Sequence, residues 1–151
     1  MRKNLVTMLD ELGTHELLGL RSTEDLFSGC GGLLFATSAL LFPVFVGDEL
    51  RNFGGNRKMM SQRLFQEMIE AFLAPRLASM PEALVIPLGI SVEAALEWLA
   101  ARGEFDTARM LKGFPHPSGA NGHRARIFRS NAASLRAQMV TWFASRSPGN
   151  A

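Results

Sequence analysis

The side chains best suited to chemistry gather in one polar stretch, residues 114–124. This stretch carries two imidazoles, a hydroxyl, a carboxamide and a guanidinium, but no carboxylate. Such a set favours binding or stabilising an anion over abstracting a proton. Its two prolines and two glycines are incompatible with a helix interior or a central strand, so the stretch is predicted to be a loop. A plain polar connector can have the same composition, and that alternative stays open.

The charge distribution also favours an anionic partner near this loop. The formal net charge is only +2, so attraction of nucleic acid by the whole surface is not expected. All 14 acidic residues lie at or before Asp106. Residues 112–151 contain no acid and six cations, namely Lys112, Arg124, Arg126, Arg129, Arg136 and Arg146. This basic quarter begins at the loop and predicts an anionic partner, unless counter-ions alone neutralise it.

Length and composition predict one domain over residues 1–146, followed by a frayed tail at 147–151. The single cysteine excludes a disulfide within the chain and a cysteine-rich metal site, so no metal and no cofactor are expected. Asp10 and Glu11 interrupt the early apolar residues, which argues against a signal peptide. The longest apolar run, 33–46, is too short and broken to span a membrane. A reducing, cytoplasmic location is therefore expected.

The loop must be positioned by the elements around it, and apolar spacing predicts these. Residues 33–36, 83–89 and 110–114 are predicted to be strands. Helices are predicted at 4–20, with a break at Gly13–Thr14, and at 57–73, 91–102 and 126–145. The alternation predicts an α/β fold with three layers, in which a short parallel sheet is flanked by helices. The loop would then follow the third strand, at the edge where such sheets bind ligands.

Three residues outside the loop are candidates for a base pocket. Ser38 follows the first predicted strand, although its hydroxyl could equally bond to backbone there. Asn52 and Phe53 lie in a polar loop and could contact a nucleotide by a hydrogen bond and by stacking. The methionines in 57–73 are expected in the core and not at a ligand site.

Three segments together resemble a known family. They are residues 33–38, residues 85–91, which end in Leu88–Gly89 and enter a helix, and the tripeptide His116–Pro117–Ser118. The combination resembles the uracil-DNA glycosylase superfamily over about residues 30–145, and the tripeptide in its context is the diagnostic part. The resemblance implies an α/β fold and removal of uracil or a related damaged base from single- or double-stranded DNA.

The resemblance also implies roles for single residues. His116 would donate a hydrogen bond to the carbonyl oxygen of a base flipped out of DNA. It would thereby stabilise the leaving group by about 3–4 kcal/mol. Pro117 and Ser118 would lie against the DNA backbone, with the Ser118 hydroxyl donating to a phosphate.

The rest of the loop is assigned to DNA in the same way. The residues Gly119, Ala120, Asn121, Gly122 and His123 would fill the gap that the flipped base leaves. Arg124 and Arg126 would contact phosphates.

The family's first motif, Gly-x-Asn/Asp-Pro-Gly/Tyr, is not found before Leu33. The residue that would position water therefore has no counterpart in this sequence. The expected domain is the C-terminal part of the family's fold, without its first strand, as a fragment, a truncated product or a divergent member. An apolar face exposed in this way would favour self-association.

The expected function is that of a nucleoid-associated DNA repair glycosylase that hydrolyses the N-glycosidic bond. The alternative is a catalytically impaired remnant that binds DNA without releasing a base. A small-molecule module or hydrolase is also open, although the Gly-x-Ser-x-Gly motif of many hydrolases is absent. A purely structural protein is the last alternative.

Overall fold

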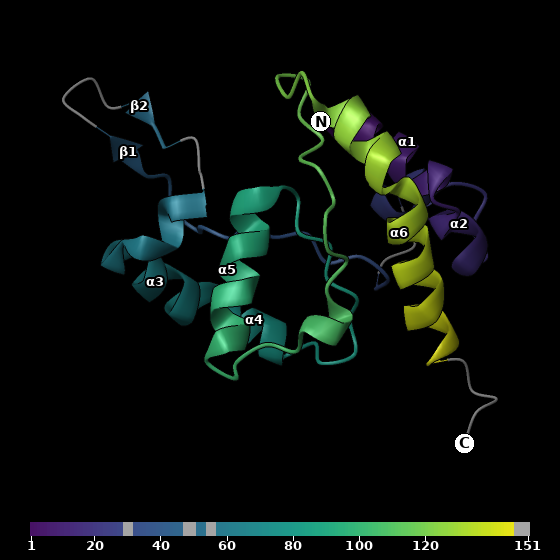
Figure 1. Ribbon diagram of the computed structural model, residues 1–151. Coiled ribbons are helices and arrows are strands. Elements are labelled where there is room, and N and C mark those ends of the chain that lie inside the picture. The colour runs from purple at the N-terminus through teal and green to yellow at the C-terminus, as the bar shows by residue number, and fades with distance from the viewer. Residues whose placement is uncertain (29–31, 47–50, 54–56, 147–151) are drawn as a thin grey trace. The chain divides into compact units, whose positions relative to one another are not determined.

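The computed structural model describes residues 1–28, 32–46, 51–53 and 57–146, and it is mostly helical (Figure 1). The chain divides into two compact units, and each is described by itself. Unit 1 consists of Met1–Ala36 and Leu111–Ala151, and unit 2 of Thr37–Met110. The single domain expected over 1–146 stays a prediction, and the tail at 147–151 lies outside the described residues.

Six α-helices are described. In unit 1 they are α1 (Arg2–Glu11), α2 (Thr14–Leu17) and α6 (Arg124–Ala144), and in unit 2 they are α3 (Arg63–Met68), α4 (Ala74–Ala78) and α5 (Ile90–Ala101). Short 3₁₀ turns are described at Thr23–Phe27, Arg57–Ser61 and Thr107–Arg109. The four helical regions predicted from apolar spacing are confirmed, with ends that shift by a few residues.

The predicted break between α1 and α2 is confirmed at Gly13. Its backbone is left-handed, with φ of 76°, which glycine adopts without strain. A side chain at this position would also approach Glu16, since an added Cβ would lie 3.0 Å from the Glu16 carboxylate. Gly13 therefore lets α2 turn away from the direction of α1.

The long helix predicted at 57–73 is built from several pieces. A π-helical turn, Ile69–Leu73, separates α3 from α4. Pro75 follows it in the first turn of α4. Proline has no N–H to donate and its ring crowds the carbonyl four residues earlier, so a change of helical geometry just before Pro75 is expected.

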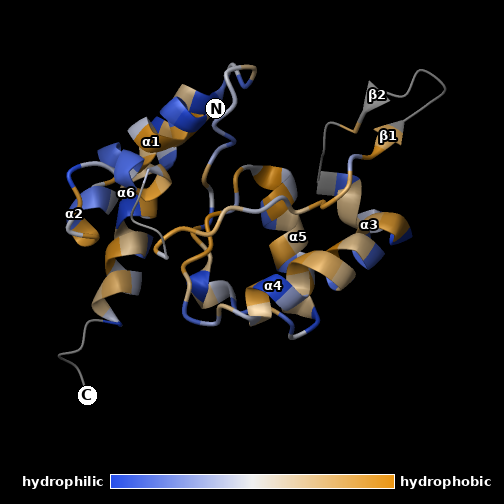
Figure 2. Ribbon diagram, turned by 180° about the vertical axis from the view of Figure 1, so that it is seen from behind, coloured by the Kyte–Doolittle hydropathy of each residue, from blue (hydrophilic) through white to orange (hydrophobic). Residues whose placement is uncertain are grey.

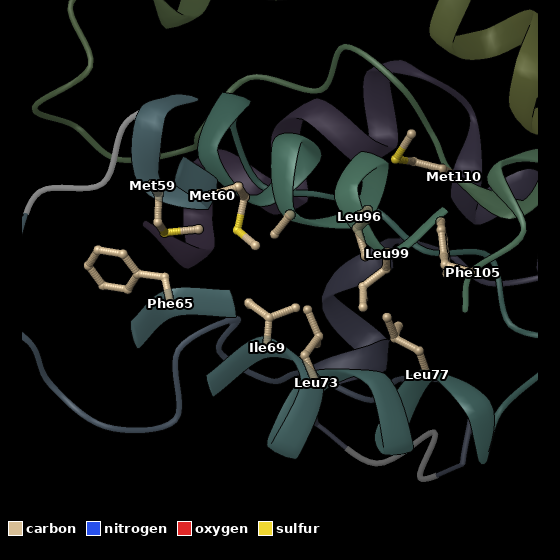
Figure 3. Close-up of a cluster of buried hydrophobic side chains, with 11 residues drawn as sticks. Met59, Met60, Phe65, Ile69, Leu73, Leu77, Leu96, Leu99, Phe105 and Met110 are labelled. Carbon is tan, nitrogen blue, oxygen red and sulfur yellow. The ribbon is translucent and has the colours of Figure 1, made fainter. Parts of the chain in front are cut away.

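Unit 2 is organised around one apolar cluster, in which helices α3, α4 and α5 face one another (Figure 3). Phe65, Ile69 and Leu99 are at most 1% exposed. The cluster consists of Met59, Met60, Phe65, Ile69, Leu73, Leu77, Ala95, Leu96, Leu99, Phe105 and Met110. The prediction that methionines of this region lie in the core is confirmed for Met60 and Met68.

Unit 1 has its own buried side chains, several of which come from α1 and α6. Both helices carry hydrophilic and hydrophobic residues in turn along their length (Figure 2). Helix α6 buries Phe128, Leu135, Met139 and Trp142. Ile127 is 36% exposed, whereas its neighbour Phe128 takes the buried position.

The expected α/β fold, with three layers around a short parallel sheet, is wrong. The described strands are β1 (Phe45–Val46) and β2 (Arg51–Asn52), which form an antiparallel pair of two residues each. One parallel bridge, Val85 with Met110, joins two of the three segments predicted to be strands. Beyond that bridge, the described parts of the chain contain no parallel pairing.

The first predicted strand fails because its apolar side chains are not buried. Residues 33–36 are irregular, and Leu33 and Phe35 are 59% and 57% exposed. A continuous apolar run forms a buried strand only where other elements cover both faces of that strand, and here the side chains are exposed. Self-association through such a face stays a prediction.

Candidate functional site

The loop at 114–124 is anchored by its apolar residues and exposes its first histidine. Phe114, Pro115 and Pro117 are buried, whereas His116 between the prolines is exposed. The Phe114 ring packs edge-on against Phe128 of α6, with centroids 6.2 Å apart. Because Pro115 and Pro117 fix their own backbone angles, the His116 side chain is presented from a rigid support.

Carboxamides of α6 hold the segment that enters the loop. The Asn131 Nδ2 group donates to the Gly113 carbonyl at 2.9 Å. Gln138 accepts from the Lys112 N–H at 2.9 Å and donates to its carbonyl at 3.3 Å. These side chains satisfy backbone groups that a neighbouring strand would otherwise pair, which explains why 110–114 does not extend a sheet.

His116 has one ring nitrogen engaged by the loop itself. Its Nδ1 accepts a hydrogen bond from the Ser118 backbone N–H at 3.2 Å. An imidazole nitrogen that accepts carries no proton, so the neutral ring has its proton on Nε2. His116 is therefore set to donate from Nε2 to a group outside the protein.

The rest of the loop is held by hydrogen bonds of Ser118, Asn121 and Arg124. Asn121 donates from its side chain to the His116 carbonyl at 3.2 Å and accepts from the His123 N–H at 3.2 Å. The Ser118 hydroxyl accepts from the Ala120 N–H at 3.2 Å, which leaves its own proton to donate. Arg124 Nη1 donates to the Ser118 carbonyl. The loop is thus ordered by its own polar groups at the start of α6.

Helix α1 supports the same loop from the side. Asn4 donates from Nδ2 to the Pro117 carbonyl at 2.9 Å. Asn4 and Arg124 also line a hollow of about 300 Å³ between α1 and α6, called the α1–α6 hollow below. Buried Met8 and Phe128 form its apolar part, and its remaining lining residues are Thr7, Glu11, Ala125 and Arg129.

The basic residues of the site lie at the start of α6. Arg126 and Arg129 are exposed and Arg124 is half-buried. The first turn of α6 contains no acidic residue. A helix N-terminus already carries partial positive charge, so these arginines add to a field that attracts anions.

The three residues predicted for a base pocket belong to unit 2, whereas the loop belongs to unit 1. Ser38 is exposed in an irregular segment. Asn52 lies in β2, and its backbone pairs with Phe45. The Phe53 ring packs against core residue Phe65, with centroids 4.5 Å apart. Their assignment to a base pocket stays a prediction.

Among the described residues, no group of three or more His, Cys, Asp or Glu side chains could hold a metal ion. Within the same part of the chain, no helix is both long enough and apolar enough to cross a membrane.

Two structural clusters were not predicted from the sequence. Buried Arg109 donates to the carbonyls of Leu77 and Met80, at and beyond the end of α4, and lies over the Phe105 ring. Asp10, at the end of α1, accepts from Ser22 and Thr23. The Ser22–Thr23 pair before an acidic turn indicated a helix cap, but its distant carboxylate partner could not be read from it.

Comparison with known proteins gives one relative. The chain is similar to a protein of Bacillus subtilis (strain 168) called "Uncharacterized protein YoxB". The two are 35% identical over 146 residues, which make up 95% of this chain and 56% of the relative. The chain therefore spans about half the length of that protein. No protein-family model matches the chain, and no solved structure does either.

Proposed function

We propose that this chain binds DNA at the loop 116–121 and the start of α6, and that it releases uracil or a related damaged base by hydrolysing the N-glycosidic bond. The observation that carries this proposal is the bond from the Ser118 N–H to His116 Nδ1. It engages Nδ1 of the exposed ring, so that in the neutral tautomer the proton is on Nε2 and can be donated to a ligand.

A donor of this kind suits a leaving base. When the glycosidic bond of uracil breaks, negative charge develops on the base and spreads onto its carbonyl oxygens. A preorganised donor that faces such an oxygen stabilises the transition state more than the ground state. Because His116 is supported by buried Pro115 and Pro117, little reorganisation is needed when the charge forms.

The residues next to His116 suit the DNA backbone. The Ser118 hydroxyl keeps its proton for donation to a phosphate, and Arg126 is exposed on the first turn of α6. Arg124 already donates to Ser118, so it both orders the loop and adds positive charge. A cytoplasmic, nucleoid-associated location is proposed with this role. The role depends on the loop and not on a parallel sheet.

A second function, DNA binding without base release, is favoured by the absence of an acid at the loop. The hydrogen bonds described for residues 114–124 run to backbone and neutral side-chain groups, with no carboxylate partner. A carboxylate or carboxamide that positions water would be needed for hydrolysis.

One experiment distinguishes base release from DNA binding without release. The purified chain is incubated with uracil-containing single-stranded and duplex oligonucleotides, and both base release and binding are measured. If the chain is a glycosylase, His116→Ala lowers release by about 10²–10³-fold, as loss of one oxyanion donor does elsewhere. His123→Ala is the matched control, since it removes an exposed imidazole from the same loop.

Release that survives His116→Ala would contradict the role of His116. Salt-dependent binding without release would support the second function instead. Absence of both binding and release would contradict the two together.

A further inference from the structure

We propose that unit 2 docks further polypeptide on an apolar surface made by Leu41, Phe42, Phe45 and Phe72, called the Phe42 surface below. The occupant is polypeptide of the kind that forms the unmatched part of the Bacillus subtilis relative. This inference does not depend on the proposed function, because it concerns a different unit and involves no DNA.

The inner side of the segment that carries the Phe42 surface is already packed. Ala39, Leu40 and Val44 lie against the apolar cluster of unit 2. The Val44 carbonyl accepts a hydrogen bond from the Phe53 N–H at 2.7 Å. Residues 39–45 are therefore held on unit 2 in a defined position, although residues 39–44 form neither a helix nor a strand.

The outer side of the same segment is apolar as well, and it is open. Leu41, Phe42 and Phe45 are 40%, 54% and 49% exposed. The Phe42 ring meets the half-buried Phe72 ring edge-on, with centroids 5.3 Å apart. Single exposed apolar residues are common, but a cluster of them on one segment marks an interaction surface. A segment that is apolar on both sides is typical of a layer buried between two others.

The backbone of the segment indicates that the occupant is polypeptide and not lipid. In the part of the chain that the structure describes, the backbone groups of residues 39–43 make no hydrogen bond. Lipid would leave these groups unpaired, which costs free energy, whereas polypeptide can pair them. Asp48 and Glu49 follow the segment in the sequence, and their charges would oppose an anionic membrane surface.

The length of the relative gives a source for such polypeptide. The matched residues make up 56% of the relative, so nearly half of that protein has no counterpart in this chain. Additional chain gains most where it covers apolar surface that the shared part leaves open. A second copy of this chain is the competing occupant, and its binding is an alternative outcome of the test.

Hydrogen exchange tests the proposal on two intact proteins. This chain and the Bacillus relative are each purified, and exchange is followed by mass spectrometry in peptides that cover residues 39–45 here and the aligned residues there. We expect the segment to exchange on the order of 100-fold more slowly in the relative, where additional chain covers it. Equal exchange in the two proteins would overturn the proposal.

Co-expression identifies the surface on this chain. The part of the relative outside the match is produced as a tagged polypeptide together with this chain, and the amount of chain retained on the tag is measured. Phe42→Ser and Phe45→Ser should each lower retention about tenfold, because each removes an aromatic anchor. Ile90→Ser is the matched control, since Ile90 is 52% exposed on the same unit but outside the segment. Trp98 fluorescence checks that unit 2 is folded in each variant.

Retention that falls equally in all three variants would overturn the assignment of the Phe42 surface. Sedimentation of the chain alone tests for a second copy. A dimer that Phe45→Ser abolishes, without retention on the tag, would replace the proposed occupant by this chain itself. Binding to phosphatidylglycerol vesicles that Phe45→Ser abolishes would replace it by lipid. None of these measurements involves DNA, so their failure leaves the proposed function untouched.

Discussion

In unit 2, helices α3, α4 and α5 meet through apolar side chains, whereas in unit 1 helix α6 holds the candidate site through carboxamides as well as through apolar packing. Leu99 and Ile69 of unit 2 are fully buried among other apolar groups. Asn131 and Gln138 of α6 bond to the backbone of Gly113 and Lys112, and Phe128 of α6 packs against Phe114. The difference indicates that burial dominates the packing of unit 2, while in unit 1 polar contacts act together with apolar packing to determine where the loop lies.

Each unit contains one of the two tryptophans, which allows the units to be followed separately. Trp98 lies in α5 of unit 2 and Trp142 in α6 of unit 1. In a Trp142→Phe background, fluorescence during urea unfolding reports on unit 2. In a Trp98→Phe background it reports on unit 1.

The largest expected effect is the loss of a core leucine from unit 2. Leu99→Ala, measured with Trp98, should lower the free energy of unfolding by about 2–5 kcal/mol, because it removes buried atoms and leaves a cavity. Leu64→Ala is the control, since Leu64 is 54% exposed, and it should change stability by less than about 0.5 kcal/mol. Equal losses of unfolding free energy in the two variants would show that burial of Leu99 does not stabilise unit 2. An equal shift of the urea midpoint seen by Trp142 would show that the two units do not unfold separately.

Burial in unit 2 was also the part of the fold that the sequence predicted best. The spacing of Phe65, Met68 and Ile69 indicated a helix with one apolar face, and all three are buried. Leu64, in the same helix, is 54% exposed although it is apolar. Periodicity predicts that a helix exists better than it predicts every residue on its face.

The strands were mispredicted for a different reason. An apolar run such as 33–36 indicates low polarity, but it does not show whether another element covers it. Residues 110–114 have a strand-like composition, and their partners proved to be side chains on α6 more than 15 residues later in the chain. Such long-range side-chain pairing leaves no local pattern in a single sequence.

The loop and the helix after it were predicted, but the contacts that hold the loop were not. Composition and spacing indicated a Pro/Gly-rich loop and a helix from residue 126, and the structure has a loop followed by α6 from Arg124. His116 was singled out by the resemblance to a family motif. The contribution of Asn4 was missed, because it bonds to Pro117 across a separation of 113 residues. The α1–α6 hollow could not be predicted for the same reason.

A smaller effect is expected from the polar contacts of unit 1. Asn131→Ala removes the donor to the Gly113 carbonyl and should lower the free energy of unfolding, measured with Trp142, by about 1–2 kcal/mol. Thr141→Ala, which removes an exposed hydroxyl from the same helix, should change it by less than about 0.5 kcal/mol. DNA binding should weaken in Asn131→Ala only. A loss of stability without a loss of binding would show that Asn131 does not position the loop.

The smallest expected effect concerns Asp10, where α1 ends. Partial burial on its own raises the pKa of this carboxyl, but hydrogen bonds from the Thr23 N–H and from the Ser22 and Thr23 hydroxyls, together with nearby His15, hold the pKa below its ordinary value of 3.8. The unfolded chain therefore takes up the proton more readily than the folded chain. The stability that Asp10 contributes is present above pH 3.8 and is lost as the pH falls through the lowered folded pKa.

Asp10→Asn should therefore reduce the acid sensitivity of unit 1, measured as the change in the Trp142 urea midpoint between neutral pH and pH values below 3.8. The effect is expected to be small because the carboxylate is 28% exposed and partly screened by water. Glu24→Gln is the matched control, since it removes an exposed charge from the adjacent turn while the Asp10 contacts stay in place. An acid response that is identical in Asp10→Asn and in the unaltered chain would mean that the charge of Asp10 adds nothing to unit 1.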